Sequence, residues 1–586
     1  MWGGRPRLLR VSRPALKVAQ LIGRRGAGTR PAALPLLAAQ ASGARLNLPA
    51  LQVAPVFITI GGPQRPRGCA NVGLSMSRTT IAVRNWIMRI HRWMGVAFCL
   101  LFLMWFASGI VMIYCRFPHV ETTDRLARAA SLDPRRIHIP PTSAFGMLHE
   151  SAAPTQIRLY VLDGRPVYRF EFGRRVKLVF ADDAERLDFV SKQMALLIAA
   201  AWAGFPATAV SFQGLVTDDQ WTLDSAAYPH GPFWKYSWPN GEEVYVSQTT
   251  GEVVQDTTRS ARLGAYCGAI PHWLFFVPLR RHVAIWSQVV IWLSGAGAAM
   301  SLLGLVAGIW IYSPSKRYRF PDGSSSIPYR GPKRWHVFLG LTFGVVTCTW
   351  VFSGFLSMEP FSWLAGPDCP NLDEALQGRR LDMAKFADKD PRQAIAEAGA
   401  ELRVKVLEFA SFDGDAIYVA VETPRHARIV PMHGSPRAVF DTGRIVDAVK
   451  RAVSPAAILE TRLVYTYEPY YVDRYKQLPL PVIYFRLNDA SQSAYYIDPR
   501  TGKVVQRYGA RSRWNRWLYH GLHSMDLPWL YARRPAWDIC VIVLLLGGTA
   551  LSITALSIAW KVVRRTVRAR VLKPVGAPRR TGRTLP

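Results

Sequence analysis

The sequence HRWMGVAFCLLFLMWFASG, residues 91–109, returns 245 residues later as HVFLGLTFGVVTCTWVFSG, residues 336–354. One histidine, two glycines, a phenylalanine, a tryptophan and a serine keep their spacing, while most residues between them change. Each copy lies almost wholly within an uncharged apolar run that is long enough to cross a hydrocarbon core of about 30 Å as a helix. The repeat therefore predicts two transmembrane helices whose shared residues face something common to both.

Four such runs predict four transmembrane helices in this chain of 586 residues, of which 50% are hydrophobic and 12% aromatic. A buried core helix is the alternative for any single run, but core helices rarely exceed about 20 residues without a polar face. A mean hydropathy of +0.06 leaves room for sizeable domains in water. The four runs are Trp93–Cys115, Val283–Tyr312, Trp335–Met358 and Ile539–Trp560.

The positive charge is concentrated in three segments. Of the formal net charge of +33, twenty-nine charges lie in residues 1–92, 313–334 and 561–586. Four spans place these segments on one side of the membrane, and the positive-inside rule makes that side cytoplasmic. The two large loops then lie outside the cytoplasm and carry little net charge, which argues against nucleic-acid binding.

A second repeat precedes the second and fourth apolar runs. YVSQTTGEVVQ, ending at Gln255, returns as YIDPRTGKVVQ, ending at Gln506, at an offset of 251 residues. The same offset carries His272 onto His523. Two matching features at the same offset predict that the chain holds two copies of one unit. Each unit consists of a helix, an external domain and a second helix.

We therefore expect a mixed fold with four transmembrane helices in two pseudo-repeats, each carrying an external α+β domain. Alternating stretches such as IRLYVLDGRPVYRFEF and AIYVAVETP are typical of strands, and RIVDAVKRAV is typical of a helix. The predicted order is a transmembrane helix at 84–115, an external domain at 116–282, a helix at 283–312, a basic cytoplasmic loop at 313–334, a helix at 335–358, an external domain at 359–536, a helix at 537–562 and a basic cytoplasmic tail at 563–586.

The first 75 residues are rich in arginine, glycine, proline and alanine and contain no acidic residue. MSRTTIAVRNWIMRIHRW, from Met76, is typical of a short cytoplasmic lead into the first span. We therefore expect residues 1–75 to be a disordered arm, or sequence upstream of a true start at Met76, in preference to a cleaved targeting segment.

The shared residues of the first span fall on one helix face. At 100° per residue, five of the six project within about 40° of one line, and only Ser108 lies off it. Small and aromatic residues on such a stripe suit a helix-packing seam. Four histidines, two at each membrane side, suit instead the axial ligation of haem iron by pairs of neutral imidazoles. The five aligned residues are His91, Gly95, Phe98, Trp105 and Gly109.

The haem hypothesis predicts one or two haem b groups, each held by one histidine from either copy of the unit. A glycine one turn along from each cytoplasmic histidine would clear space beside a flat macrocycle. The predicted ligand pairs are His91 with His336 and His272 with His523, and the glycines are Gly95 and Gly340. Second-rank candidates, as alternative ligands or as partners of haem propionates or lipid headgroups, are His520, His282, Arg280, Arg281, Arg533 and Arg534.

Several other kinds of site are missing from the sequence. The spans hold no carboxylate, which argues against a proton-coupled or ion-coupled transporter. There is no His-Glu-x-x-His motif and no glycine-rich phosphate loop, and the seven cysteines form no Cys-x-x-Cys pair. Because no nicotinamide or flavin domain is present, a quinol or a partner reductase would have to supply any electrons.

Both span repeats, the TGEVV and TGKVV turns and the stretch WLYHGLHSMDLPWLYARRPAWD from Trp517 resemble the PepSY-associated transmembrane proteins of bacterial inner membranes. The resemblance covers about Arg84 to Arg565. It implies an inner-membrane protein with cytoplasmic termini and periplasmic PepSY-type modules. The family includes iron-regulated membrane proteins and haem b reductases that release iron from ferric siderophores, so the resemblance also implies electron transfer to a periplasmic ferric chelate in iron uptake.

PepSY modules also occur in peptidase propeptides and sensors, where they bind or inhibit. The alternative function is therefore a non-enzymatic sensor or accessory protein whose periplasmic modules bind a peptidase or another envelope partner. The two hypotheses make opposite predictions, because a haem protein depends on its histidine pairs and a sensor tolerates their replacement by alanine.

Overall fold

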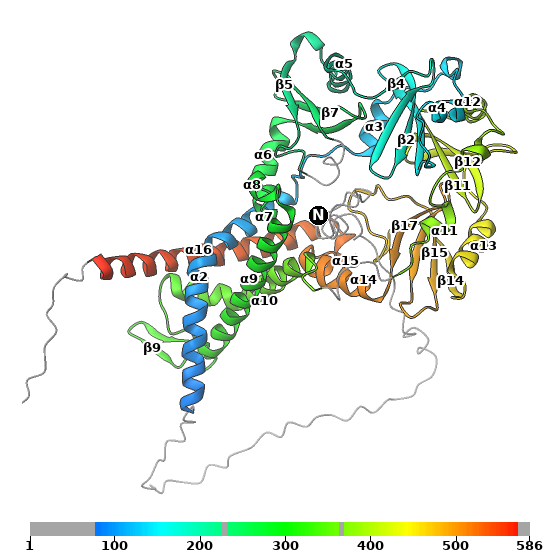
Figure 1. Cartoon of the computed structure of the whole chain (residues 1–586). Helices are drawn as coiled ribbons and strands as arrows, with labels where there is room; N and C mark the ends of the chain where they lie inside the picture. The colour runs from blue at the N-terminus through cyan, green and yellow to red at the C-terminus, as the bar shows by residue number, and fades with distance from the viewer. Residues whose placement is uncertain (1–76, 224–230, 362–368, 572–586) are drawn as a thin grey trace, which may run out of the picture.

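Four long helices form the membrane part of the chain (Figure 1). Each is long and apolar enough to cross a bilayer, which confirms the four spans predicted from the sequence. The computed structural model describes residues 77–223, 231–361 and 369–571, so the arm predicted at 1–75 lies outside the described residues. The four helices are α2 (Arg78–Met112), α9 (Val283–Ile311), α10 (Pro332–Ser357) and α16 (Ala536–Val571).

Two of these helices have ends set by local chemistry. The Ser77 hydroxyl accepts a hydrogen bond from the backbone N–H of Thr80 at 3.1 Å, so α2 begins six residues before the predicted start of the span. The last helix, α16, continues to Val571, past the predicted boundary at residue 562, because its arginine-rich end contains no helix breaker before Pro574. Both extensions carry arginine and lie on the side predicted to be cytoplasmic.

The four helices close into a ring in the order α2, α9, α10 and α16, so each half contributes two adjacent helices. Helix α2 packs against α9 and α16, and α10 packs against the same two helices, so α2 and α10 stand at opposite corners. Large apolar side chains fill the centre, among them Phe102, Phe106, Trp350 and Trp537. Phe106 lies so close to Gly548 that a Cβ atom there would come within 2.4 Å of the ring, so the glycine makes room for the aromatic side chain.

The two external regions share one sheet of seven strands. Its order is β13-β12-β11-β1-β2-β3-β4, and β1 from the first half pairs antiparallel with β11 from the second. In this pairing Arg158 lies opposite Glu408, 250 residues later in the chain. The strands are β1 (Gln156–Leu162), β2 (Arg165–Phe172), β3 (Arg175–Phe180), β4 (Arg186–Leu187), β11 (Val406–Phe412), β12 (Asp415–Thr423) and β13 (His426–Pro431).

Each half adds a four-stranded antiparallel sheet of its own, in the orders β5-β6-β7-β8 and β14-β15-β16-β17. The last turn of each sheet contains the predicted glycine, Gly251 at φ +68° and Gly502 at φ +65°. The strands are β5 (Ser211–Val216), β6 (Phe233–Ser237), β7 (Glu243–Ser247), β8 (Val253–Thr257), β14 (Ile458–Val464), β15 (Val482–Leu487), β16 (Ala494–Asp498) and β17 (Lys503–Tyr508).

One helix fills the space between the shared sheet and each four-stranded sheet. Helix α5 (Lys192–Ala203) buries Ala195 and Ala199 in the first half, and α13 (Thr442–Val453) buries Ile445 and Val449 in the second. The remaining helices are short: α3 (Thr122–Arg128), α4 (Pro141–Gly146), α6 (Arg259–Cys267), α7 (Ala269–Trp273), α8 (Val277–Arg280), α11 (Asp373–Gln377), α12 (Pro391–Gly399), α14 (Ala510–Asn515), the π-helix η5 (Arg516–Gly521) and α15 (Pro528–Tyr531). A hairpin, β9 (Tyr318–Phe320) and β10 (Gly323–Ser325), connects α9 to α10.

Candidate functional site

The two histidines on the side predicted to be external, called the external pair below, lie next to each other where the sheet regions meet the bundle. His272 belongs to α7 and His523 follows η5, and their ring centroids are 6.1 Å apart with an angle of 70° between the ring planes. Burial lowers the pKa of His272 to about 3 and that of His523 to about 4. Both imidazoles are therefore neutral, which is the form that binds a metal ion.

Each external histidine sits in a socket built by the transmembrane helix of its own half. The Nδ1 atom of His272 lies 3.1 Å from the carbonyl oxygen of Trp105 and 3.1 Å from the hydroxyl of Ser108. In the second half, His523 Nδ1 lies 3.0 Å from the Trp350 carbonyl and 3.1 Å from the Ser353 hydroxyl. A carbonyl can only accept, so Nδ1 carries the proton in both rings and Nε2 keeps its lone pair.

A glycine completes each external socket. A Cβ atom at Gly109 would lie 3.7 Å from His272 Cε1, and one at Gly354 would lie 3.6 Å from His523 Cε1. Trp105, Ser108 and Gly109 are three of the six positions that the two span sequences share. Contact with an external histidine therefore explains three of the six shared positions in each copy.

The other two histidines, on the side predicted to be cytoplasmic and called the cytoplasmic pair below, lie across the bundle from each other on α2 and α10. The ring centroids of His91 and His336 are 6.2 Å apart, with 35° between the ring planes. His91 Nδ1 donates to the Met300 carbonyl at 3.1 Å. His336 Nδ1 lies 3.2 Å from the hydroxyl of Thr554, which itself donates to the Leu551 carbonyl at 2.7 Å. The Nε2 atoms of this pair are therefore also left unprotonated.

The glycines near the cytoplasmic pair differ in their surroundings. A Cβ atom at Gly95 would meet nothing within 4 Å, and one at Gly340 would meet only Leu551 Cδ1 at 3.8 Å. At Gly304 of α9, by contrast, a Cβ atom would come within 2.4 Å of His91 Cε1. Gly304 thus allows the imidazole to lie against α9, while the two predicted glycines border open space.

The second-rank residues have other surroundings. His282 is exposed at the N-cap of α9, and His520 is buried against the ring of Tyr519, at 4.7 Å between centroids. Arg281 donates to Asp218 at 2.6 Å and Arg534 donates to Asp538 at 2.7 Å, so carboxylates of the chain itself neutralise both guanidinium groups. Arg280 is buried over the ring of Trp286, at 4.8 Å, and Arg533 is exposed.

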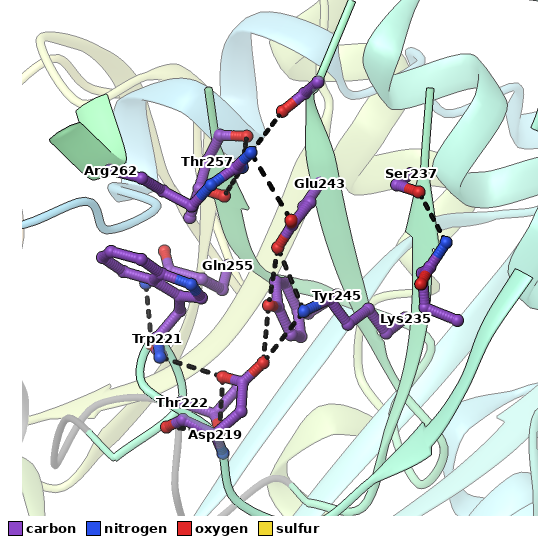
Figure 2. Close-up of polar contacts among 12 residues, drawn as sticks. Asp219, Trp221, Thr222, Lys235, Ser237, Glu243, Tyr245, Gln255, Thr257 and Arg262 are labelled. Carbon is purple, nitrogen blue, oxygen red and sulfur yellow. Dashed lines mark hydrogen bonds and ion pairs between the residues drawn. The ribbon is translucent and has the colours of Figure 1, made fainter. Parts of the chain in front are cut away.

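A polar network fixes the helix that leads to His272 (Figure 2). Arg262 of α6 donates to the Gly241 carbonyl at 2.8 Å and forms an ion pair with Glu243 at 3.5 Å. Lys235 bridges Glu243 and Asp219 at 3.0 and 3.1 Å. Burial raises the pKa of Tyr245 far above its usual value, so the phenol keeps its proton and donates to Asp219 at 2.7 Å.

The second half holds the segment before His523 in a similar way. Arg513 of α14 stands 251 residues after Arg262 and donates to the carbonyl of Gln492, 251 residues after Gly241, at 2.8 Å. Tyr496, 251 residues after Tyr245, donates to Glu468 at 2.7 Å. In both halves, an arginine clamps the helix after the last strand onto the preceding hairpin. The two arginines were not predicted from the sequence, because each contacts a carbonyl 21 residues earlier in the chain.

Few kinds of metal site can be built from these two histidine pairs. Among residues 77–223, 231–361 and 369–571, no three or more His, Cys, Asp or Glu side chains gather in a way that could hold a metal ion. A bare zinc or copper site built from four protein ligands is therefore not formed in this part of the chain. A pair of imidazoles suits a metal whose remaining ligands come from elsewhere.

The fold and the site define a multi-pass membrane protein with two buried histidine pairs. The sequence matches the PepSY-associated TM region over residues 88–401, more than half of the chain. The chain therefore belongs to the PepSY-associated TM family, as the sequence motifs predicted. No curated protein matches the sequence.

Proposed function

We propose that this protein is a haem b protein that passes electrons to an acceptor outside the cytoplasm. The observation that carries the proposal is the pairing of the four histidines, at 6.2 Å between His91 and His336 and 6.1 Å between His272 and His523. Two imidazoles bound to one iron at about 2 Å per Fe–N bond have centroids about 6 Å apart. Both pairs match this separation.

The hydrogen bonds at Nδ1 support the same proposal. Histidines that bind metals usually donate their other ring N–H to a carbonyl or hydroxyl oxygen, which fixes the ring and makes the ligating nitrogen more basic. All four rings have such a partner, for instance the Met300 carbonyl for His91 at 3.1 Å. The open space beside Gly95 and Gly340 would accept the edge of a macrocycle.

The proposed arrangement is two copies of one unit related by a pseudo-twofold axis. Matching residues lie 245 residues apart in the spans and 251 residues apart in the second repeat, which supports this arrangement. The β1–β11 pairing, in which Arg158 lies opposite Glu408, supports it as well. The positive-inside rule places the basic segments in the cytoplasm, and the sheets in the periplasm of a bacterium whose inner membrane holds the protein.

In this mechanism the chain would bind the haem groups, orient their histidine ligands and exclude water from the sites. The four imidazoles would hold two haem groups, and the Trp105 and Trp350 carbonyls would fix the external rings. When bound, haem supplies one-electron transfer through its Fe(III)/Fe(II) couple. The aromatic centre of the bundle, including Phe102 and Phe106, excludes water between the two sites. The donor is proposed to be a quinol or a partner reductase, and the acceptor a ferric siderophore or another ferric chelate.

An optical spectrum tests the proposal. Protein purified from cells supplied with haem should show a reduced b-type spectrum with two haem groups per chain, and ferric chelate should oxidise the reduced form. A colourless preparation whose four histidines all tolerate alanine, and which captures a periplasmic partner, would support the alternative of a sensor or accessory protein instead.

A further inference from the structure

Behind the equivalent external sockets, the two halves of the chain differ at one pair of buried positions. Arg516, the first residue of the π-helix η5, forms an ion pair at 3.3 Å with Asp526, three residues after His523. The two side chains are 2% and 13% exposed. The residues 251 positions earlier are Ala265 and Phe275, which both lie in a buried apolar cluster. An ion pair in the second half therefore takes the place of apolar packing in the first.

Stability does not explain this ion pair. Replacing a buried ion pair by apolar residues of similar volume is often neutral or stabilising, and the first half shows that the same fold accepts apolar residues at both positions. Arg516 Nη1 and Asp526 Oδ1 are also buried without a hydrogen-bond partner among residues 77–223, 231–361 and 369–571. Buried polar atoms in this state cost free energy. The pair therefore needs another reason to be present.

Arg516 closes the segment that carries His523. Its Nε donates to the carbonyl of Pro469 at 3.1 Å, in the connection between β14 and β15, and its Nη2 donates to the backbone carbonyl of Asp526 at 2.9 Å. The backbone N–H of Asp526 donates in turn to the carbonyl of His520 at 3.2 Å. Residues 516–526 thus form a closed loop around His523, and one guanidinium group ties that loop to the neighbouring sheet region.

The first half closes the matching segment with a neutral donor. The carbonyl of Phe275, which matches Asp526, accepts a hydrogen bond from the side-chain amide of Gln220 at 2.6 Å. His272 lies in the α-helix α7, whereas the matching segment of the second half is a π-helix, a form that is rare and frequent at functional sites. The carbonyl three residues after each external histidine is therefore held in both halves, by an amide in one and by an arginine in the other.

We propose that Arg516 is a positioning residue for His523, which holds the loop so that the imidazole keeps its distance and orientation toward His272. The inference rests on the proposed function, because it takes His523 as an axial ligand of the external haem. A guanidinium suits this role, since its rigid fork of donors can hold two carbonyls at once. The Asp526 carboxylate balances the charge that this fork brings into the interior.

The reactivity of the imidazoles tests the inference in the full chain without haem. Diethyl pyrocarbonate modifies neutral imidazole nitrogens, and peptide mass spectrometry gives the rate at each histidine. In the variant Arg516→Met with Asp526→Leu, His523 should react about fivefold faster, the effect of losing one buried hydrogen bond, while His272 in the same molecules keeps its rate. Gln220→Leu should do the reverse, with a faster reaction at His272 and an unchanged rate at His523.

Arg516→Lys is a second variant, which keeps the buried charge but offers a single ammonium group to two carbonyls. His523 should react faster in this variant as well, at an unchanged thermal unfolding midpoint. In the protein loaded with haem, both changes at Arg516 should shift the electron paramagnetic resonance signal of the external centre alone.

Two results would overturn the role of Arg516. These are an unchanged rate at His523 in both Arg516 variants, and an equal acceleration of His523 and His272. A wild-type chain that binds no haem would instead overturn the proposed function, and the ratio of the two rates decides the role of Arg516 in either case.

Discussion

The two histidine pairs differ in how closely their surroundings follow the repeat. Both external imidazoles meet the same three groups, a tryptophan carbonyl, a serine hydroxyl and a glycine. In the cytoplasmic pair, His91 meets the Met300 carbonyl, and His336 meets the backbone of Leu551, 251 residues after Met300, together with the Thr554 hydroxyl. The ring planes differ too, by 70° in the external pair and 35° in the cytoplasmic pair. The external sockets are therefore equivalent, and the cytoplasmic ones share a backbone contact but differ in the Thr554 hydroxyl beside His336.

This difference bears on the chemistry of the two sites. The partner at Nδ1 controls how much electron density the imidazole gives to a bound metal, and the Thr554 hydroxyl adds a second partner at His336 in the cytoplasmic pair. Two equivalent ligands and two inequivalent ligands should therefore give two distinguishable redox centres. Variants at each pair should therefore affect one centre more than the other.

Removing a whole pair should abolish one centre and spare the other. We expect His272→Ala with His523→Ala, or His91→Ala with His336→Ala, to leave about half of the wild-type haem per chain, because both residues proposed to hold one haem group are then missing. The haem-to-protein ratio measures this. His282→Ala, at the exposed N-cap of α9, serves as the control and should change nothing. Wild-type haem content in either double variant would contradict the assignment of that pair.

Crowding His91 should damage the cytoplasmic centre alone. In Gly304→Ala the new Cβ atom would lie 2.4 Å from His91 Cε1, so the ring must move. The electron paramagnetic resonance signal of the cytoplasmic centre should shift or disappear, while that of the external centre stays. Gly344→Ala is a suitable control, because its Cβ atom would meet Leu305 at an ordinary 3.4 Å. Equal effects on both signals would show that the two pairs are not independent.

Acid should destabilise the protein through the external pair. The pKa values of about 3 for His272 and about 4 for His523 lie below the ordinary 6.5, so only the unfolded chain takes up these protons as the pH first falls. The free energy of unfolding should therefore decrease as the pH drops from about 6.5 toward 4. Thermal midpoints measured across this range should fall less steeply in the variant His272→Gln with His523→Gln. An identical slope in both proteins would assign the acid sensitivity to other groups.

Removing one hydroxyl should have the smallest effect. Ser108→Ala and Ser353→Ala each delete one hydrogen-bond partner of an external histidine, and each should cost about 1 kcal/mol in the free energy of unfolding. Both should also shift the midpoint potential of the external centre by similar amounts, because the two sockets are equivalent. Thr554→Val should shift only the cytoplasmic centre. Unequal shifts in midpoint potential for the two serine variants would show that the two external sockets are not equivalent.

The spans and the histidine positions could be predicted because apolar length and internal repeats can both be read directly from the sequence. Apolar length identifies a span, and a constant offset identifies matching residues in two copies. The role of Ser108 was not predicted, because its projection on its own helix points away from the shared stripe. Its hydroxyl contacts His272 next to the Trp105 carbonyl. Because His272 comes from a separate helix, the spacing of residues along the first span could not predict this contact.

Contacts between distant segments escaped prediction for a related reason. Arg281 was a candidate for an anionic partner, but it is held by Asp218, which lies 63 residues earlier in the chain. The pairing of β1 with β11 joins residues about 250 positions apart. Strand pairing over such separations leaves no periodicity in the sequence, so the shared sheet could be found only in three dimensions.

The shared sheet also imposes an order on how the protein is made. Strand β11 follows the third span, so the edge of β1 keeps open backbone N–H and C=O groups until that later part of the chain has been synthesised. During synthesis the first half is thus an unfinished structure that needs protection from pairing with foreign strands. A gene cut after α9 should yield an aggregating fragment, and supplying the second half as a separate chain should rescue it.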